Sequence, residues 1–257
     1  MSEARLDILV AKKLDCSREY AKSLILSGHV LVQDKLCKKP GNMFSEDAAI
    51  DISQPETAYV SRGGYKLEKA LTYFTIDVSG LTCMDIGAST GGFTDCLLQN
   101  SAARVYTVDN GSSQLAQKLA ADSRVIATEN RNINSLTKNE LPMVDFICID
   151  VSFVSVKKII DKSAEFLKDY GNAVILIKPQ FEAERAVRVK NDRKTHAAIL
   201  RALYDGITGS GLGIRNLCKS PITGKDGSTE YLMHAVKSGD TLDMPAYAEL
   251  IKTLLRG

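Results

Sequence analysis

The sequence has no tryptophan, only three histidines, and no apolar run near the ~20 residues that a membrane-spanning helix needs. Its first seven residues are polar and lack the apolar core of a secretory signal. These absences argue against a membrane-inserting or exported protein, and we expect a cytoplasmic one. Aromatic residues make up 6% of the chain and charged residues an ordinary 25%, so composition alone suggests no specialised class.

The cysteines lack the spacing of a metal site or a disulfide framework. No Cys-x-x-Cys pair occurs, and no histidine lies at metal-ligand spacing from a cysteine. We therefore expect no metal, and reduced, mostly buried thiols at six positions: Cys16, Cys37, Cys83, Cys96, Cys148 and Cys218.

The net charge of +2 is too small to identify a nucleic-acid partner, but the charge is unevenly distributed. Residues 1–44 hold eight Lys or Arg against five Asp or Glu. A length of 257 residues allows one catalytic domain and a small appendage. The polar, proline-bearing segment 53–57 resembles a linker, so we expect domains at 1–60 and 61–257.

Beyond the linker, a helix is expected from Ser61 through Phe74, and apolar strands then alternate with helical segments. This alternation predicts an α/β fold, a seven-stranded doubly wound sheet of the Rossmann-like methyltransferase type. The expected strands are residues 82–87, 104–109, 124–128, 144–149, 173–178, 214–220 and 229–236.

Two of these strands run into polar residues typical of a nucleoside-cofactor site. Asp85-Ile-Gly-Ala-Ser-Thr-Gly-Gly-Phe93 supplies a glycine turn, and Asp109 follows Gly87 by 22 positions, near the ~20-residue interval of a ribose-binding acid. No glycine pattern suited to a pyrophosphate is present, which favours S-adenosylmethionine over a dinucleotide. A purely structural glycine turn is the alternative. The predicted cofactor-binding residues are Asp85, Gly87, Ser89, Gly91, Gly92, Phe93, Asp109, Asn132 and Asp150.

Two members of this set have a second interpretation. Phe93 follows the glycine turn, where a core position is the stronger interpretation than a stacking platform. Asn132 follows the third strand, where it either meets an adenine or forms a turn.

Charged residues end two strands of the predicted sheet. Asp150 follows Ile147-Cys-Ile149, and Lys178 follows Ile175-Leu-Ile177. A charged side chain at the end of an apolar strand is costly to bury unless it is paired with an opposite charge or has a functional role. Glu230 begins the last strand at the same edge, and Lys66 approaches from the helix before the first strand. These four residues are the catalytic candidates, and a structural ion-pair network is the alternative.

The amino-terminal segment predicts two small helices and a few short strands. A helix is expected from about Arg5, a second after Ser17 as its N-cap, and strands at 30–32 and 50–52. Arg18 and Lys22 lie one helical turn apart and can face an RNA backbone. The predicted RNA-binding residues are Arg5, Ser17, Arg18, Lys22, Lys39 and Arg62.

Several strings in residues 3–52 resemble the αL RNA-binding domain: Arg5-Leu-Asp7, Ser17-Arg-Glu19, Ile25 to Val32, and Lys39-Pro-Gly41. The catalytic candidates resemble the Lys-Asp-Lys-Glu tetrad of the FtsJ/RrmJ 2′-O-ribose methyltransferases. Together, the two halves resemble the TlyA family, often labelled hemolysins. The resemblance implies methylation of cytidine ribose in ribosomal RNA, with S-adenosylmethionine as the methyl donor.

That chemistry suits the residue types. A ribose 2′-hydroxyl is a weak nucleophile, and a neutral lysine amine can take its proton as the methyl is transferred. A lysine in water has a pKa of ~10.4, so the base needs burial and a nearby like charge. Lys178 is the candidate for this base, with Lys66 supplying the like charge while Asp150 and Glu230 orient the amines and the ribose; because the two acids oppose a lowered pKa, the assignment among the four residues stays open.

The chain departs from the family pattern in residues 183–194, where a charged stretch replaces a glycine-rich loop, and in Gly227-Ser-Thr-Glu230. Three alternatives stay open: a non-catalytic RNA-binding or ribosome-assembly factor, a small-molecule methyltransferase, and a pore-forming hemolysin. The sequence names neither the nucleotide, nor the form of the RNA substrate, nor the oligomeric state.

Overall fold

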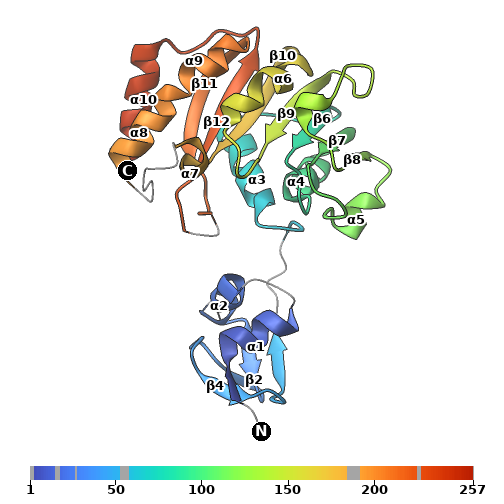
Figure 1. Cartoon of the computed structure of the whole chain (residues 1–257), viewed down its shortest axis with the longest axis vertical. Coiled ribbons are helices and arrows are strands. Elements are labelled where there is room, and N and C mark those ends of the chain that lie inside the picture. The colour runs from blue at the N-terminus through green and yellow to red at the C-terminus, as the bar shows by residue number, and fades with distance from the viewer. Residues whose placement is uncertain are drawn as a thin grey trace. The chain divides into compact units, whose positions relative to one another are not determined.

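The chain forms two compact units, Met1–Thr57 and Ala58–Gly257 (Figure 1). In the computed structural model, the described residues are 3–14, 18–26, 28–52, 58–183, 192–224 and 227–256.

The amino-terminal unit packs two helices against short strands. Its elements are β1 (Glu3–Arg5), α1 (Leu6–Lys13), α2 (Arg18–Leu26), β2 (Val30–Val32), β3 (Lys35–Leu36), β4 (Met43–Ser45) and β5 (Ile50–Ile52). β1 pairs with β4, and β2 lies between β3 and β5. Apolar residues at helical spacing on α1 and α2, including Leu6, Val10 and Ile25, are buried together with Val30 and form the core.

The expected helices and the strands at 30–32 and 50–52 are present in this unit. The β1–β4 ladder was missed, because Glu3–Arg5 and Met43–Ser45 lack the β-branched apolar residues that mark the strands at 30–32 and 50–52. Arg5 therefore ends a strand and precedes α1, whereas the helical spacing predicted that Arg5 begins the helix.

The second unit is built on a seven-stranded sheet with the order β11-β12-β10-β9-β6-β7-β8. β12 runs antiparallel to both of its neighbours, and the other pairings are parallel. The strands are β6 (Thr82–Ile86), β7 (Arg104–Val108), β8 (Val125–Thr128), β9 (Val144–Ile149), β10 (Leu167–Ile177), β11 (Leu212–Lys219) and β12 (Tyr231–Lys237). The predicted methyltransferase-type sheet is confirmed.

One strand is longer than expected. β10 begins at Leu167, six residues before the expected start, and pairs with β9 across an irregularity between Leu167 and Asn172. Tyr170 in this stretch has a φ of 61°, which interrupts the regular strand. The stretch is also polar, so the sequence showed no apolar run that would predict the first part of the strand.

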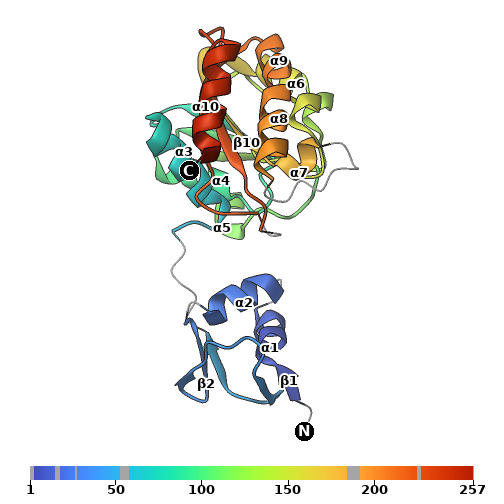
Figure 2. The same ribbon diagram turned by 90° about the vertical axis from the view of Figure 1, so that its left-hand side faces the viewer.

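Helices cover both faces of the sheet, with α3 and α4 on one side and α6, α8 and α9 on the other (Figure 2). The helices are α3 (Gly63–Phe74), α4 (Gly92–Gln99), α5 (Gln117–Ala120), α6 (Ile160–Glu165), α7 (Pro179–Glu182), α8 (Arg193–Ala202), α9 (Tyr204–Gly209) and α10 (Met244–Arg256), with 3₁₀ turns η1 (Ile133–Ser135) and η2 (Val156–Lys158). The doubly wound arrangement is therefore confirmed as well.

The order of the strands changes direction at β6: β7 and β8 are added on one side of it, and β9 is then added on the other. β6 pairs with β7 on one side and with β9 on the other. In open α/β sheets, ligands bind at the carboxyl ends of the strands at such a switch point. A Cβ on Gly87, just past β6, would lie 2.5 Å from the Asp150 carbonyl oxygen, so only glycine allows the two strand ends to approach this closely.

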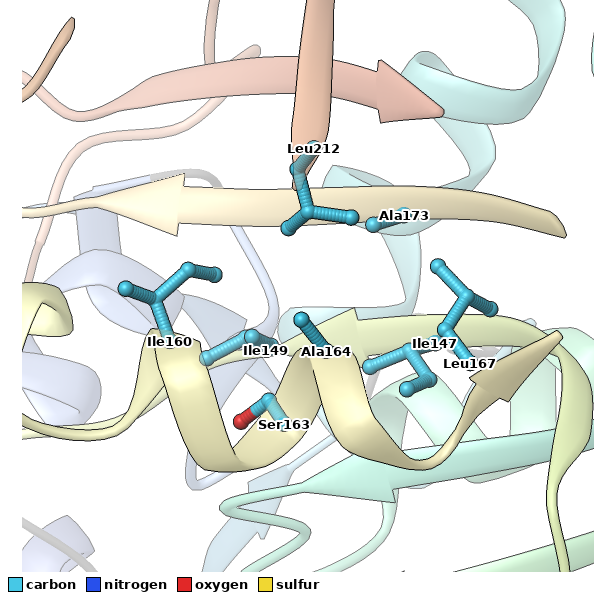
Figure 3. Close-up of a pocket in the computed structure, with 8 residues that line it drawn as sticks. All are labelled: Ile147, Ile149, Ile160, Ser163, Ala164, Leu167, Ala173 and Leu212. Atoms are coloured by element: carbon cyan, nitrogen blue, oxygen red, sulfur yellow. The ribbon is translucent and has the colours of Figure 1, made fainter. Parts of the chain in front are cut away.

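Between β9, β10 and α6 lies a small gap lined by Ile147, Ile149, Ile160, Ser163, Ala164, Leu167, Ala173 and Leu212 (Figure 3). The gap is apolar and has no room for a water molecule. Its one hydroxyl, on Ser163, donates to the Ile159 carbonyl at 2.8 Å. We therefore regard it as core packing, separate from the strand ends.

The described cysteines, at positions 37, 83, 96, 148 and 218, are all free and buried, as expected; Cys16 lies outside the described residues. Among the described residues, no helix combines the length and the apolar character needed to cross a membrane.

Candidate active site

The turn after β6 has the left-handed geometry that its glycines predict. Gly87 and Gly91 have φ values of 86° and 92°, and Ser89 between them has a φ of 47°. Gly91 is the N-cap of α4. The turn therefore presents backbone groups at the carboxyl edge of the sheet, where a nucleoside cofactor is expected.

Asp85 lies beneath this turn and is fully buried. Its Oδ2 accepts a hydrogen bond of 2.6 Å from the Thr94 hydroxyl, while its Oδ1 has no partner among the described residues. Burial raises the pKa of Asp85 to about 7, against the opposing effect of the Thr94 hydrogen bond. A buried carboxylate oxygen without a donor is unusual in a folded protein.

Asp109 follows β7, next to the glycine turn. Its two oxygens accept hydrogen bonds from the backbone N–H groups of Ser89 at 2.8 Å and Gly111 at 2.7 Å. Each carboxylate oxygen has a further lone pair, so the group can still accept from hydroxyl donors. Asp109 thus shapes the turn and remains available to a ribose.

Gly91, Gly92 and Phe93 have packing explanations. A Cβ on Gly91 would lie 2.3 Å from Leu119 Cδ1, and one on Gly92 would lie 2.2 Å from Ser61 Oγ. Phe93 is buried in the core between α3, α4 and the sheet. These residues hold the turn in place, and for Phe93 the core interpretation agrees with its burial.

Asn132 is an exposed residue whose side-chain oxygen accepts from Asn134 N at 2.9 Å. It is the N-cap of η1, so the turn-forming interpretation accounts for it.

The first lysine–acid pair joins α3 to the start of β12. Lys66 Nζ donates to Glu230 Oε2 at 2.5 Å, with 11% and 3% of the two side chains exposed. Glu230 is 164 residues from Lys66 in sequence, so the fold alone brings the two together. Nearly buried charges are tolerable only when paired in this way.

The second pair lies at the ends of β9 and β10. Lys178 Nζ is 2.5 Å from Asp150 Oδ1 and donates to the Ser152 hydroxyl at 2.8 Å. The Asp150 contact lacks hydrogen-bond alignment, whereas the Ser152 contact has it. The predicted catalytic residues therefore form two ion pairs, Lys66–Glu230 and Lys178–Asp150.

Phe153 is a residue of this region that the sequence analysis did not single out. Its side chain is 91% exposed and its φ is 64°, a strained value for an aromatic residue. Its ring lies 5.0 Å from that of Phe181, and Lys178 Nζ is 5.9 Å from the Phe181 ring. The signal in the sequence was a bulky aromatic residue in the polar loop directly after the strand that ends at Asp150.

In the amino-terminal unit, two predicted RNA-binding arginines share one buried carboxylate. Arg5 donates to both oxygens of Asp7 at 3.1 and 3.0 Å, and Arg18 Nε lies 3.1 Å from Asp7 Oδ2. Hydrogen bonding from Arg5 holds the pKa of Asp7 below its usual range. Both arginine side chains remain almost half exposed, so the cluster keeps an outward positive charge.

Of the other predicted RNA-binding residues, Lys39 and Arg62 are exposed and Lys22 is half-buried. Ser17 lies outside the described residues, as does most of the atypical 183–194 stretch, residues 184–191. Within the described part of the chain, no three metal-ligating side chains come together.

Comparisons with known proteins agree with this arrangement. Residues 59–237 match the FtsJ-like methyltransferase family, and residues 4–50 match the S4 domain. The chain is 40% identical to Hemolysin A of Brachyspira hyodysenteriae over 86% of this chain and 94% of that protein. It is 35% identical to the 16S/23S rRNA (cytidine-2′-O)-methyltransferase TlyA of Mycobacterium tuberculosis over 90% of this chain and 88% of that protein.

Among solved structures, a protein of Streptococcus thermophilus provisionally described as a hemolysin has a TM-score of 0.78 and 35% identity, covering 100% of this chain and 97% of that one. The matched proteins thus cover both units of this chain. Some are named as hemolysins and others as rRNA methyltransferases. The chain belongs to the FtsJ-like methyltransferase family, in the TlyA group that joins an S4 domain to the catalytic domain.

Proposed function

We propose that the protein is an S-adenosylmethionine-dependent 2′-O-ribose methyltransferase of ribosomal RNA, with cytidine as the target nucleotide. The observation that carries this proposal is the pair of nearly buried lysines, Lys66 and Lys178, each held by an acid at the carboxyl edge of the sheet. The S4 domain match and the rRNA methyltransferase relative support RNA as the substrate.

The residues around the glycine turn fit S-adenosylmethionine. The unpartnered Oδ1 of Asp85 would accept from the cofactor's α-ammonium, directly or through water. Asp109 would accept from the ribose hydroxyls, and the turn from Gly87 to Gly91 allows close approach of the backbone. The bound cofactor supplies an electrophilic methyl group.

The lysines and acids would act on the RNA. Lys178 is the base that takes the 2′-hydroxyl proton, and Asp150 and Ser152 hold its Nζ. Lys66 adds positive charge, while Glu230 fixes its position.

The amino-terminal unit would bind the RNA backbone. Arg5 and Arg18, held by Asp7, and the exposed Lys39 would contact phosphates, and Arg62, an exposed residue of the second unit, would add a further contact. These contacts carry no sequence information, so the choice of nucleotide would depend on the catalytic unit and on RNA shape.

The test is transfer of labelled methyl from S-adenosylmethionine to ribosomal RNA and to intact ribosomal subunits. We expect label in one nucleotide whose 3′ phosphodiester resists alkaline cleavage, because a methylated 2′-oxygen cannot attack the phosphate. Label on a base would contradict the ribose assignment. Cofactor binding with no transfer to any ribosomal substrate would instead support a non-catalytic assembly factor.

A further inference from the structure

The loop between β9 and η2 is fastened to the segment after β10 at three points. The segment 178–182 faces the loop 150–156 through an ion pair with a hydrogen bond, an aromatic contact, and a carboxylate that accepts two hydrogen bonds. The contacts are Lys178 with Asp150 and Ser152, Phe181 with Phe153, and Glu182 with Ser155 and Val156.

Of the three contacts, the one made by Glu182 lies farthest along the loop from Asp150. The Ser155 hydroxyl donates to its Oε2 at 2.5 Å, and the Val156 N–H donates to its Oε1 at 2.8 Å. Ser155 is also the N-cap of η2, and its Oγ accepts from Lys157 N at 3.2 Å. Both oxygens of Glu182 are therefore used to hold the start of η2.

The backbone of the loop has few other attachments. Asp150 N donates to the Ile86 carbonyl at one end, and Val156 N donates to Glu182 at the other. Among the described residues, the backbone N–H groups of positions 151–155 make no hydrogen bond. Phe153 also holds a strained φ of 64°, which the surroundings must maintain. Glu182 thus supplies the hydrogen bonds that fix the far end of the loop.

We propose that Glu182 is a positioning residue of the methyl-transfer site, which acts by holding the loop that carries Asp150 and Ser152 against Lys178. The inference rests on the proposed function, because it assigns Glu182 a part in orienting the proposed base. A carboxylate at this place acts on the site through its hydrogen bonds to Ser155 and Val156, which use both of its oxygens. Without it, the loop would move away and Lys178 Nζ would lose its fixed position.

The first test measures the exposure of Lys178 without any RNA substrate. Purified full-length protein is treated with an amine-acylating reagent, and the labelling rates of Lys178 and Lys66 are compared by peptide mass spectrometry. The two side chains are 10% and 11% exposed, so both should react slowly in the wild type. In Glu182→Ala, we expect Lys178 labelling to rise at least fivefold while Lys66, held by Glu230, stays unchanged.

The internal control separates loosening of the loop from unfolding, which would expose both lysines. Glu182→Gln should label like the wild type, because its amide accepts from Val156 N and donates to Ser155 Oγ. Ser155→Ala removes one of the two hydrogen bonds and should give an intermediate rate. Equal labelling of Lys178 in wild type and Glu182→Ala would overturn the proposal, and so would equal increases at both lysines in Glu182→Ala and Ser155→Ala.

The second test is kinetic. Glu182→Ala should lower kcat for rRNA methylation by ~10–100-fold, because a displacement of about 1 Å at a reacting group is enough for such a loss. The Kd for S-adenosylmethionine should not change, and Glu182→Gln should recover most of kcat. If Lys178→Ala stayed active, the proposed base would be wrong; if Lys178→Ala were inactive and Glu182→Ala fully active, only the positioning role would be wrong.

Discussion

Asp85 is buried at the expense of stability, with one oxygen unpartnered and a pKa raised to about 7. An Asp in the unfolded chain has a pKa near 3.9. Between those values the folded protein keeps a proton that the unfolded chain releases, so the contribution of Asp85 to stability falls as pH rises from ~4 to ~7. Such a cost is typical of a group kept for binding.

Asp85→Asn should therefore stabilise the cofactor-free protein at pH 8, by up to roughly 4 kcal/mol, and change it little at pH 4. The same substitution should weaken S-adenosylmethionine binding at least tenfold, since an amide cannot pair with an ammonium as a carboxylate does. Thermal unfolding and calorimetric titration measure the two effects.

Asp145→Asn is the matched control. Although burial raises the pKa of Asp145, the Lys168 ammonium and the Thr82 N–H bring it below its ordinary value. Its substitution should lower stability at pH 8 and leave cofactor affinity unchanged. If Asp85→Asn were less stable than the wild type at pH 8, burial of the ionised Asp85 carboxylate would not be a cost to the stability of the folded protein.

Phe153 is an exposed aromatic residue beside Phe181, whose ring lies 5.9 Å from Lys178 Nζ, and aromatic faces stack with unpaired nucleobases. Phe153→Ala should raise KM for RNA tenfold or more, whereas Phe153→Tyr should stay within about threefold of the wild type. Tyr170→Ala, at another exposed aromatic residue with positive φ, is the control. Unchanged RNA kinetics in Phe153→Ala would exclude a stacking role.

At the scale of elements, the contact between α3 and α4 depends on glycine. A Cβ on Gly92 would lie 3.0 Å from Gly64 N and 3.1 Å from Gly63 Cα, so backbone would have to move. α3 carries Lys66 and α4 follows the glycine turn after β6. Close packing here therefore links the position of Lys66 to that of the turn.

Gly92→Ala should lower the free energy of unfolding by ~1–3 kcal/mol and reduce methyl transfer. Gly209→Ala, in a helix where an added Cβ meets no atom within 4 Å, should instead stabilise by up to about 1 kcal/mol. Chemical denaturation with both variants checks the contrast. Equal effects of the two substitutions would contradict the packing explanation.

The polar first part of β10 was not predictable, but the rest of the sheet was, because its strands contain apolar runs of ordinary length bounded by polar residues. Asp150 and Lys178 were found for the same reason, since each directly follows such a run. The pairing of Lys66 with Glu230, the hold of Glu182 on Ser155, and the sharing of Asp7 by two arginines were not predictable. These contacts join distant positions or depend on side-chain direction, which periodicity does not encode.

At the scale of the whole molecule, the two units have separate cores, one in residues 6–50 and the other in the catalytic unit. A fragment of residues 58–257 should thus fold and bind S-adenosylmethionine within about twofold of the full chain. It should bind rRNA more weakly and with a smaller dependence on salt, because the phosphate contacts proposed for the S4 domain are lost. Equal RNA affinity and salt dependence would contradict RNA binding by the amino-terminal unit.

The proposed methyl transfer depends most directly on Lys178, and single-turnover transfer to ribosomal subunits tests this role by comparing the wild type with Lys178→Ala and Lys178→Arg. Cofactor and RNA affinities are measured alongside, to show that each variant is intact. An arginine keeps the positive charge but cannot give up its proton, so both variants should be slowed ~100–10,000-fold. Near-normal transfer by Lys178→Arg would show that the residue supplies only charge, and near-normal transfer by Lys178→Ala would contradict the lysine base altogether.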